Sequence, residues 1–140
     1  MALIVDAGAL YAQADRSEPH HAAVARLLRE EPGPLVTSAL TVAEADFLIL
    51  DRLGITVELA FLDDLADGTY RVECLSQGEL KVARDLARKY RSLKLGLADC
   101  SLAVLAQRYR TRRILTFDER AFRQVVPLQG GAFTVLPADA

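Results

Sequence analysis

Four carboxylates stand where apolar runs of this chain end or begin. Asp6 follows the run Leu3–Val5, and Asp118 follows a second such run. Asp99 opens a long helix-like run, and Glu44 lies inside another. A carboxylate in apolar surroundings is costly unless a partner or a cation neutralises its charge. These residues, the four acids, therefore predict one site that holds something positive.

The chemistry of the four acids indicates which cation they would take. Their donors are all oxygen, which suits Mg²⁺ or Mn²⁺ better than zinc. One or two such ions can hold a phosphodiester, activate a water and stabilise the leaving oxygen. We therefore expect all four acids to be metal ligands and catalytic. Ser38 and Thr116 are expected nearby as hydroxyls that orient an acid or a water.

The composition indicates one globular domain without a membrane segment. The chain has 140 residues, of which 51% are hydrophobic and 26% charged, as in globular proteins. No apolar run reaches the ~20 residues of a membrane span. The N-terminus lacks the basic segment of a secretory signal. Cys74 and Cys100 lie in apolar runs and are expected to be small hydrophobic residues of a reduced, cytoplasmic protein.

The charges are distributed unevenly along the chain. From Lys81 to Arg113 there are ten Lys and Arg but only two acids, a formal charge of +8, whereas the rest carries −10. Such a separation can steer a polyanion to one surface. The alternative is a set of solvated helix faces.

Alternating strand-like and helix-like segments predict a three-layer α/β/α fold with a central, mainly parallel sheet. The strands are expected at 3–5, 35–37, 70–75, 114–117 and 133–136. The helices are expected at 8–14, from 17 to about 32, from 38 to about 52, from 56 to about 67, from 76 to about 90, from 99 to about 109, and at 119–124.

This arrangement predicts where the four acids point. Ligands of an open parallel sheet gather outside the carboxyl ends of its strands, where two of the four acids fall. Asp99 shares a helical face with Leu102 and Ala106, so it is expected to face the sheet. Glu44 shares one with Leu40, Phe47 and Leu48 and is also expected to point inward, with Asp46 as its rival. Each acid also has a plainer alternative as a helix cap, turn residue or surface residue.

The ordered motifs resemble those of a PIN domain, and more narrowly those of the VapC ribonuclease toxins of bacterial toxin–antitoxin pairs. The similarity covers nearly the whole chain. It is carried by Leu3–Leu10, by Thr37-Ser38 ahead of Glu44, by Gly96–Asp99 and by Leu115–Phe122.

The resemblance implies a single PIN-like domain over residues 1–140 that acts as a Mg²⁺- or Mn²⁺-dependent endoribonuclease with the four acids as its quartet. It also implies a homodimer and a VapB-like antitoxin that binds the toxin as a hetero-oligomer. Many relatives have Ser, Thr or Asn where this chain has Gly8, so a polar group near the metal is missing. The fourth acid varies within the family, so Glu119 could share the role of Asp118.

Basic residues ahead of the strand that delivers Asp118 fit RNA binding, because Lys and Arg position phosphates. The expected contacts to RNA or to the antitoxin are Arg108, Arg110, Arg112 and Arg113. Two alternatives keep the site but change the role. One is a housekeeping PIN nuclease of RNA processing. The other is a receiver-like regulatory module that binds Mg²⁺ without nuclease activity.

Overall fold

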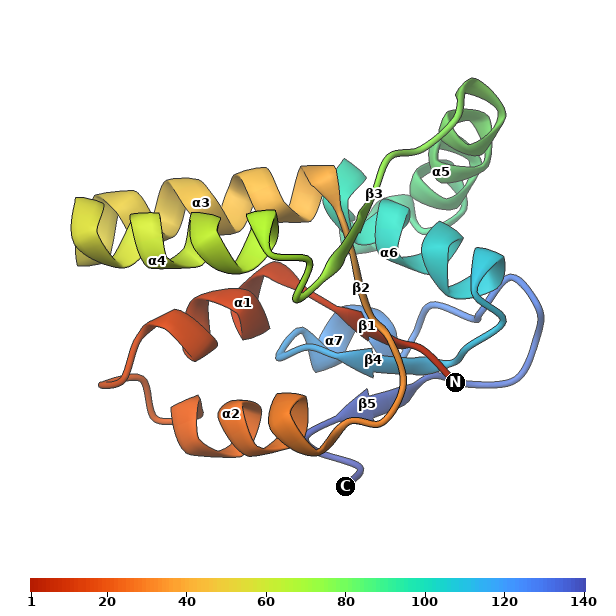
Figure 1. Ribbon diagram of the computed structural model, residues 1–140. Coiled ribbons are helices and arrows are strands. Elements are labelled where there is room, and N and C mark those ends of the chain that lie inside the picture. The colour runs from red at the N-terminus through yellow and green to blue at the C-terminus, as the bar shows by residue number, and fades with distance from the viewer.

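Five parallel strands form a sheet between two layers of helices (Figure 1). The computed structural model describes residues 1–140, and the strand order is β3-β2-β1-β4-β5. The strands are β1 (Leu3–Val5), β2 (Leu35–Ser38), β3 (Arg71–Glu73), β4 (Arg113–Leu115) and β5 (Thr134–Leu136). The helices are α1 (Ala7–Ala14), α2 (His21–Glu30), α3 (Ala39–Leu53), α4 (Ile55–Ala66), α5 (Gln77–Lys89), η1 (Arg91–Leu93), α6 (Leu97–Arg108) and α7 (Glu119–Phe122).

The alternation of side chains along the strands divides the core in two. Leu3 and Val5 belong to the cluster covered by α1 to α4, whereas Ile4 belongs to the cluster covered by α5, α6 and α7. All three residues are fully buried, as expected for a central parallel strand that is covered on both faces. The predicted α/β/α architecture with a parallel sheet is therefore confirmed.

The strand order reverses at β1, which pairs with β2 on one side and with β4 on the other. Such a switch point leaves a crevice at the carboxyl ends of the central strands. The helices α1, α3 and α7 begin just after β1, β2 and β4, so their first turns surround this edge. A receiver-like domain would have the order 2-1-3-4-5, so the sheet does not support that alternative.

The helix α6 forms the centre of one layer. Every residue from Cys100 to Ala106 is buried, because the helix packs on β1 and β2 and is covered by α5. The buried hydroxyl of Ser101 lies 2.7 Å from that of Ser38, which ties the start of α6 to the end of β2. The position of Asp99 at the site is therefore fixed by the core.

Several local predictions were wrong. The helix expected from residue 17 begins later, at His21, and Ser17 instead bonds to Asp15. In α4, Leu59 is exposed while Glu58 is buried. The strand predicted at 70–75 is reduced to β3, and Cys74, expected to be a small buried hydrophobe, is exposed. No helix has both the length and the apolar character needed to cross a membrane.

Candidate active site

Asp6 is held rigidly at the end of β1. Its side chain caps α1, with Oδ1 accepting a hydrogen bond from the Ala7 amide at 2.7 Å. Its Oδ2 accepts a hydrogen bond from the Thr116 hydroxyl at 2.6 Å. Only 8% of the residue is exposed. The pKa of this carboxyl is raised overall, chiefly by burial and also by the charge of Asp118. The two hydrogen bonds act in the opposite direction and lower it.

Asp118 reaches the same place from β4. Its Oδ1 caps α7 by accepting a hydrogen bond from the Ala121 amide. Its own amide donates to the Thr116 hydroxyl oxygen at 3.0 Å. Thr116 thus holds Asp6 through its hydroxyl proton and the Asp118 backbone through its lone pair, which is the orienting position expected for it.

Asp99 lies in the first turn of α6, half-buried and facing the other acids. Its pKa is raised to about 6, chiefly by burial and in addition by the negative charges of Asp6, Asp118 and Glu44. Carboxylates act on one another in this way only when they are close. The other three acids therefore lie close enough for their charges to act on Asp99.

Glu44 joins the site from a helix whose buried face was predicted wrongly. The residues that α3 buries are Thr41, Ala45 and Ile49, whereas Phe47, expected to point inward with Glu44, is 68% exposed. Two of these three buried residues are Thr and Ala, which carry little hydrophobic signal, and the face packs against α1, α4 and α6. Glu44 is exposed; partial burial and the charge of Asp6 still raise its pKa, so it stands at the rim of the site.

Asp46, the rival of Glu44, is used elsewhere. One of its carboxylate oxygens, Oδ1, is buried and accepts no hydrogen bond while both carboxyl groups are ionised. A hydrogen bond with Asp46 raises the pKa of buried Glu58 on α4, and burial and the charge of Asp46 add to the effect. A proton on Glu58 would give the buried Asp46 oxygen its donor. Asp46 therefore serves the contact between α3 and α4.

Two further expected residues do not touch the acids. Ser38 caps α3 by accepting a hydrogen bond from the Thr41 amide, and its hydroxyl faces Ser101. Glu119 forms an ion pair with Arg123 at 3.1 Å. Of the two residues considered for the fourth acid, it is Asp118 whose charge acts on Asp6 and Asp99.

The four arginines predicted to contact RNA or antitoxin are not brought to the acids. Arg108 bonds to Glu73 and Glu79, at the opposite end of α6 from Asp99, roughly 14 Å along the helix. Arg113 pairs with Glu31, and Arg112 donates to the Gly130 and Gln129 carbonyls. Arg110 alone has no side-chain partner in the chain. The other three stabilise the fold, and a contact from Arg110 stays a prediction.

None of the four acids has a basic partner. The ion pairs of the chain all join other residues. No group of three or more His, Cys, Asp or Glu is already arranged as a metal cage, but the donors are carboxylates and their negative charge is uncompensated. A hard divalent cation such as Mg²⁺ or Mn²⁺ fits this donor set.

An aromatic pair beside the acids was not found from the sequence. The exposed ring of His20 stacks on Phe117, with ring centroids 4.4 Å apart. Phe117 lies between Thr116 and Asp118, and a Cβ added to Gly8 would lie 3.5 Å from its ring. His20 precedes α2 by one residue and has no signal in the sequence that would pair it with Phe117. The stack gives the site an aromatic border.

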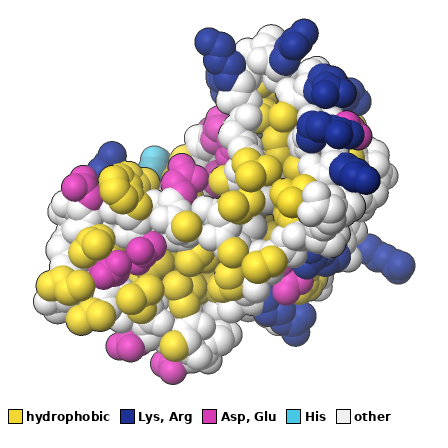
Figure 2. Space-filling view, turned by 90° about the horizontal axis from the view of Figure 1, so that it is seen from above, with side chains coloured by type: hydrophobic (Ala, Val, Ile, Leu, Met, Phe, Trp, Pro, Cys, Tyr) yellow, Lys and Arg dark blue, Asp and Glu magenta, His cyan; other side chains and the backbone are white.

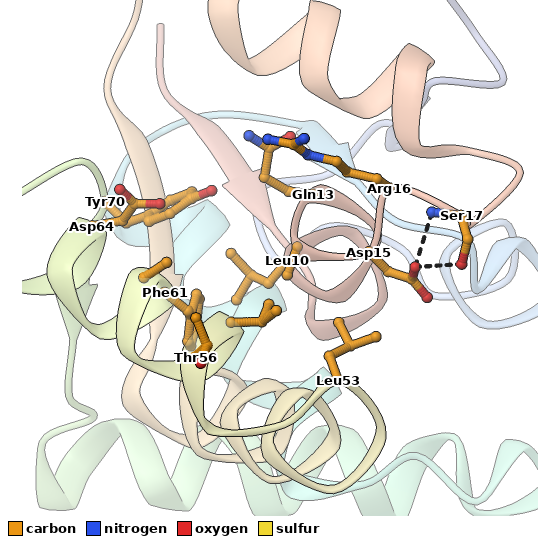
Figure 3. A pocket seen from close by; sticks show the side chains of 13 residues that line it. Leu10, Gln13, Asp15, Arg16, Ser17, Leu53, Thr56, Phe61, Asp64 and Tyr70 are labelled. Carbon is orange, nitrogen blue, oxygen red and sulfur yellow. Dashed lines mark hydrogen bonds between the residues drawn. The ribbon is translucent and has the colours of Figure 1, made fainter.

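A cavity lies away from the acids, between α1 and α4 (Figure 3). It has a volume of about 600 Å³ and an apolar floor that includes Leu10 and Phe61. Polar groups line its rim, among them Gln13, whose side-chain oxygen is buried without a partner. Burial, helped by the charge of Asp64, raises the pKa of Tyr70 on this rim to about 12. None of the four acids lines this cavity.

Comparisons with known proteins agree with the fold. The family model "PIN domain" matches residues 3–126. Ribonuclease VapC26 of Mycobacterium tuberculosis is 42% identical over 135 residues, which cover 96% of this chain and all of that protein.

Solved structures agree as well. VapC20 of Mycobacterium tuberculosis, described as a sarcin-ricin loop cleaving toxin, superposes with a TM-score of 0.77 at 17% identity, covering 84% of this chain and 90% of that one. A toxin–antitoxin complex from Klebsiella pneumoniae gives 0.66 at 19% identity, covering 88% and 92%. The strand order, the convergent acids and these matches together show that the chain belongs to the PIN domain family.

Proposed function

We propose that this protein is a metal-dependent endoribonuclease and the toxin of a toxin–antitoxin pair. One observation carries the proposal: four carboxylates converge at the carboxyl edge of a PIN-domain sheet, and none has a basic partner. The 42% identity to a ribonuclease named VapC26 supports RNA as the substrate and the toxin as the role.

The residues that would hold Mg²⁺ or Mn²⁺ are the four acids, with Asp6 and Asp99 at the centre and Glu44 and Asp118 at the rim. Such an ion supplies charge neutralisation at the scissile phosphate and lowers the pKa of a water. The protein supplies the orientation. Thr116 and the Ala7 amide each bond one oxygen of Asp6, so the lone pairs left free on this carboxylate have a fixed direction.

A protein partner is supported by the surface of α3 and α4. This helical pair exposes a set of large apolar side chains, which Figure 2 shows from above. A soluble monomer rarely leaves such a patch uncovered. The set comprises Phe47, Leu50, Ile55, Leu59 and Leu62. We propose a VapB-like antitoxin as the partner, because structural neighbours include a toxin–antitoxin complex. We also propose that the toxin is a homodimer and that it acts in the cytoplasm.

The test is to induce the protein in cells and to sequence the new 5′ ends of cellular RNA. Cleavage at a few defined sites is expected for the natural protein and none for Asp6→Asn. The same cleavage pattern from both proteins would disprove the proposal. A short adjoining reading frame whose product blocks cleavage would distinguish a toxin from a housekeeping PIN nuclease.

A further inference from the structure

A row of basic side chains lies on α5 and the loop after it, called here the basic stripe. It comprises Lys81, Arg84, Arg88, Arg91 and Lys94, all exposed. Successive members are three or four residues apart, so those on α5 share one face. That face is opposite the one that buries Ala83 and Leu86 against α6.

Partners within the chain leave most of this charge uncompensated. Arg84 bonds to Asp85 at 3.2 Å, and Lys81, Arg88, Arg91 and Lys94 form no ion pair or side-chain hydrogen bond. Favourable interaction with the helix dipole explains basic residues in the last turn of α5, such as Arg88. It does not explain Lys81 and Arg84, which lie earlier in α5, or Arg91 and Lys94, which lie beyond its end.

The packing of α5 directs the stripe toward the acids. Glu79 in the first turn of α5 bonds to Arg108 in the last turn of α6. The two helices pack together, and the loop at 90–96 leads from the end of α5 to the start of α6. The helices are therefore antiparallel, and the end of the stripe lies beside the first turn of α6, which carries Asp99.

The loop itself is fixed in place. Lys94 adopts the left-handed conformation, with φ of 53°, which non-glycine residues rarely do. The Arg120 guanidinium donates a hydrogen bond to the Leu93 carbonyl at 3.0 Å, which links the loop to α7, just beyond Asp118. This hydrogen bond holds the charged end of the stripe next to the site.

We propose that the basic stripe binds the phosphates of single-stranded RNA on one side of the scissile bond. This inference rests on the proposed nuclease function. The four acids repel a polyanion wherever no cation lies between, so flanking phosphates need a positive surface close by. The stripe supplies it, and Figure 2 shows Lys and Arg gathered on this limb of the molecule, apart from most of the Asp and Glu.

The test compares two matched double variants. Arg84→Gln/Arg88→Gln removes two charges of the stripe, and Arg26→Gln/Arg29→Gln removes two exposed charges from α2. Each pair contains one arginine with an acidic neighbour, Asp85 or Glu30, and one without. Both are made in the Asp6→Asn protein, and binding of a labelled mixed-sequence RNA of about 20 nucleotides is measured by fluorescence anisotropy.

Salt dependence gives the decisive measurement. The slope of log K against log salt is measured between about 50 and 200 mM KCl. Each lost phosphate contact makes this negative slope shallower by about 0.7, so the slope of the stripe variant should be shallower by about 1.4. The α2 variant should keep the natural slope, and Arg84→Lys/Arg88→Lys should restore most of it. In the Asp6-containing protein, the stripe variant should raise KM for RNA cleavage without changing kcat.

Equal slopes in both double variants would overturn the proposal. So would binding of a poly-glutamate peptide that is at least as tight as RNA and equally sensitive to Arg84→Gln/Arg88→Gln, because the surface would then suit an acidic protein segment. Failure of the nuclease function is separate: it would appear as no metal-dependent cleavage by the natural protein, whatever the slopes.

Discussion

Thr116 and Asp6 are 110 residues apart in the chain, yet the Thr116 hydroxyl donates a 2.6 Å hydrogen bond to the Asp6 carboxylate. The pairing of β1 with β4 brings them together. The same hydroxyl accepts a hydrogen bond from the Asp118 amide. One buried side chain therefore fixes the relative positions of two acids that follow different strands.

Loss of this bond should weaken metal binding. Thr116→Val keeps the shape of the side chain but removes the hydroxyl, so the pKa of Asp6, which the bond lowers, should rise. We expect metal affinity and cleavage to fall by about 10- to 100-fold and the pH–rate profile to shift to higher pH. Calorimetric titration with Mn²⁺ measures the first effect. Thr116→Ser should behave like the natural protein, and equal loss in both variants would contradict an orienting role.

Removal of a central carboxylate should abolish cleavage while the fold survives. Asp6→Asn and Asp99→Asn each remove a predicted metal ligand without a change in size. We expect cleavage rates at least about 100-fold lower, measured on purified protein with Mg²⁺ or Mn²⁺. The control is Asp63→Asn, which changes an exposed acid of α4. Full activity of the Asp6→Asn/Asp99→Asn double variant would refute the assignment.

The stability of the metal-free protein should fall as the pH rises through the titration of Asp99. Its pKa is raised from 3.8 to about 6, so between these values the folded protein keeps a proton that the unfolded chain has lost. The cost above about pH 6 is on the order of 1 kcal/mol after allowance for solvent screening. Mg²⁺ should therefore raise Tm more at about pH 7.5 than at about pH 5.

Asp99→Asn serves as the control for this effect. It should raise the Tm of the metal-free protein above pH 6 and reduce the increase caused by Mg²⁺. A Mg²⁺ effect that is the same at both pH values, or larger at the lower one, would show that Asp99 is not the group concerned.

Arg113 should act on stability. Its guanidinium forms two hydrogen bonds with Glu31, whose side chain is 3% exposed. Arg113→Gln leaves this carboxylate without a charged partner and should cost about 1–3 kcal/mol, seen as a lower denaturation midpoint in urea. Adding Glu31→Gln should recover much of the loss. A change in RNA affinity without a change in stability would instead favour the direct contact first expected for Arg113.

Glu58→Gln should stabilise the pairing of α3 with α4. The pKa of Glu58 is raised chiefly by its hydrogen bond with Asp46, so deprotonation sets two carboxylates against each other. A glutamine amide would donate to Asp46 at every pH. Thermal melts should show a Tm increase that is larger at about pH 8 than at about pH 4.5. Asp51→Asn, an exposed acid on α3, should show no such difference, and a Tm decrease for Glu58→Gln at about pH 8 would argue against the pairing.

The sequence determined the strand and helix order and the positions of Asp6 and Asp118. Strand runs such as Leu3–Val5 are apolar because both faces of a central parallel strand are buried, so they can be read from composition. Asp99 followed from helical spacing on α6, whose buried face is long and apolar. The helix predicted from residue 76 begins there, and the structure shows Ser76 and Glu79 forming a capping box at the start of α5.

Tertiary structure decided which residues those elements meet. The inner face of α3, which packs against other helices, contains Thr41 and Ala45. Hydrophobicity alone therefore indicated the wrong face of this helix and predicted that Glu44 points inward. Arg108, Arg112 and Arg113 bind acids and carbonyls that are distant in sequence. Most of the basic stripe, like Arg110, has no such partner and stays available to a ligand. A sequence states which groups are present, whereas long-range packing decides which of them remain free.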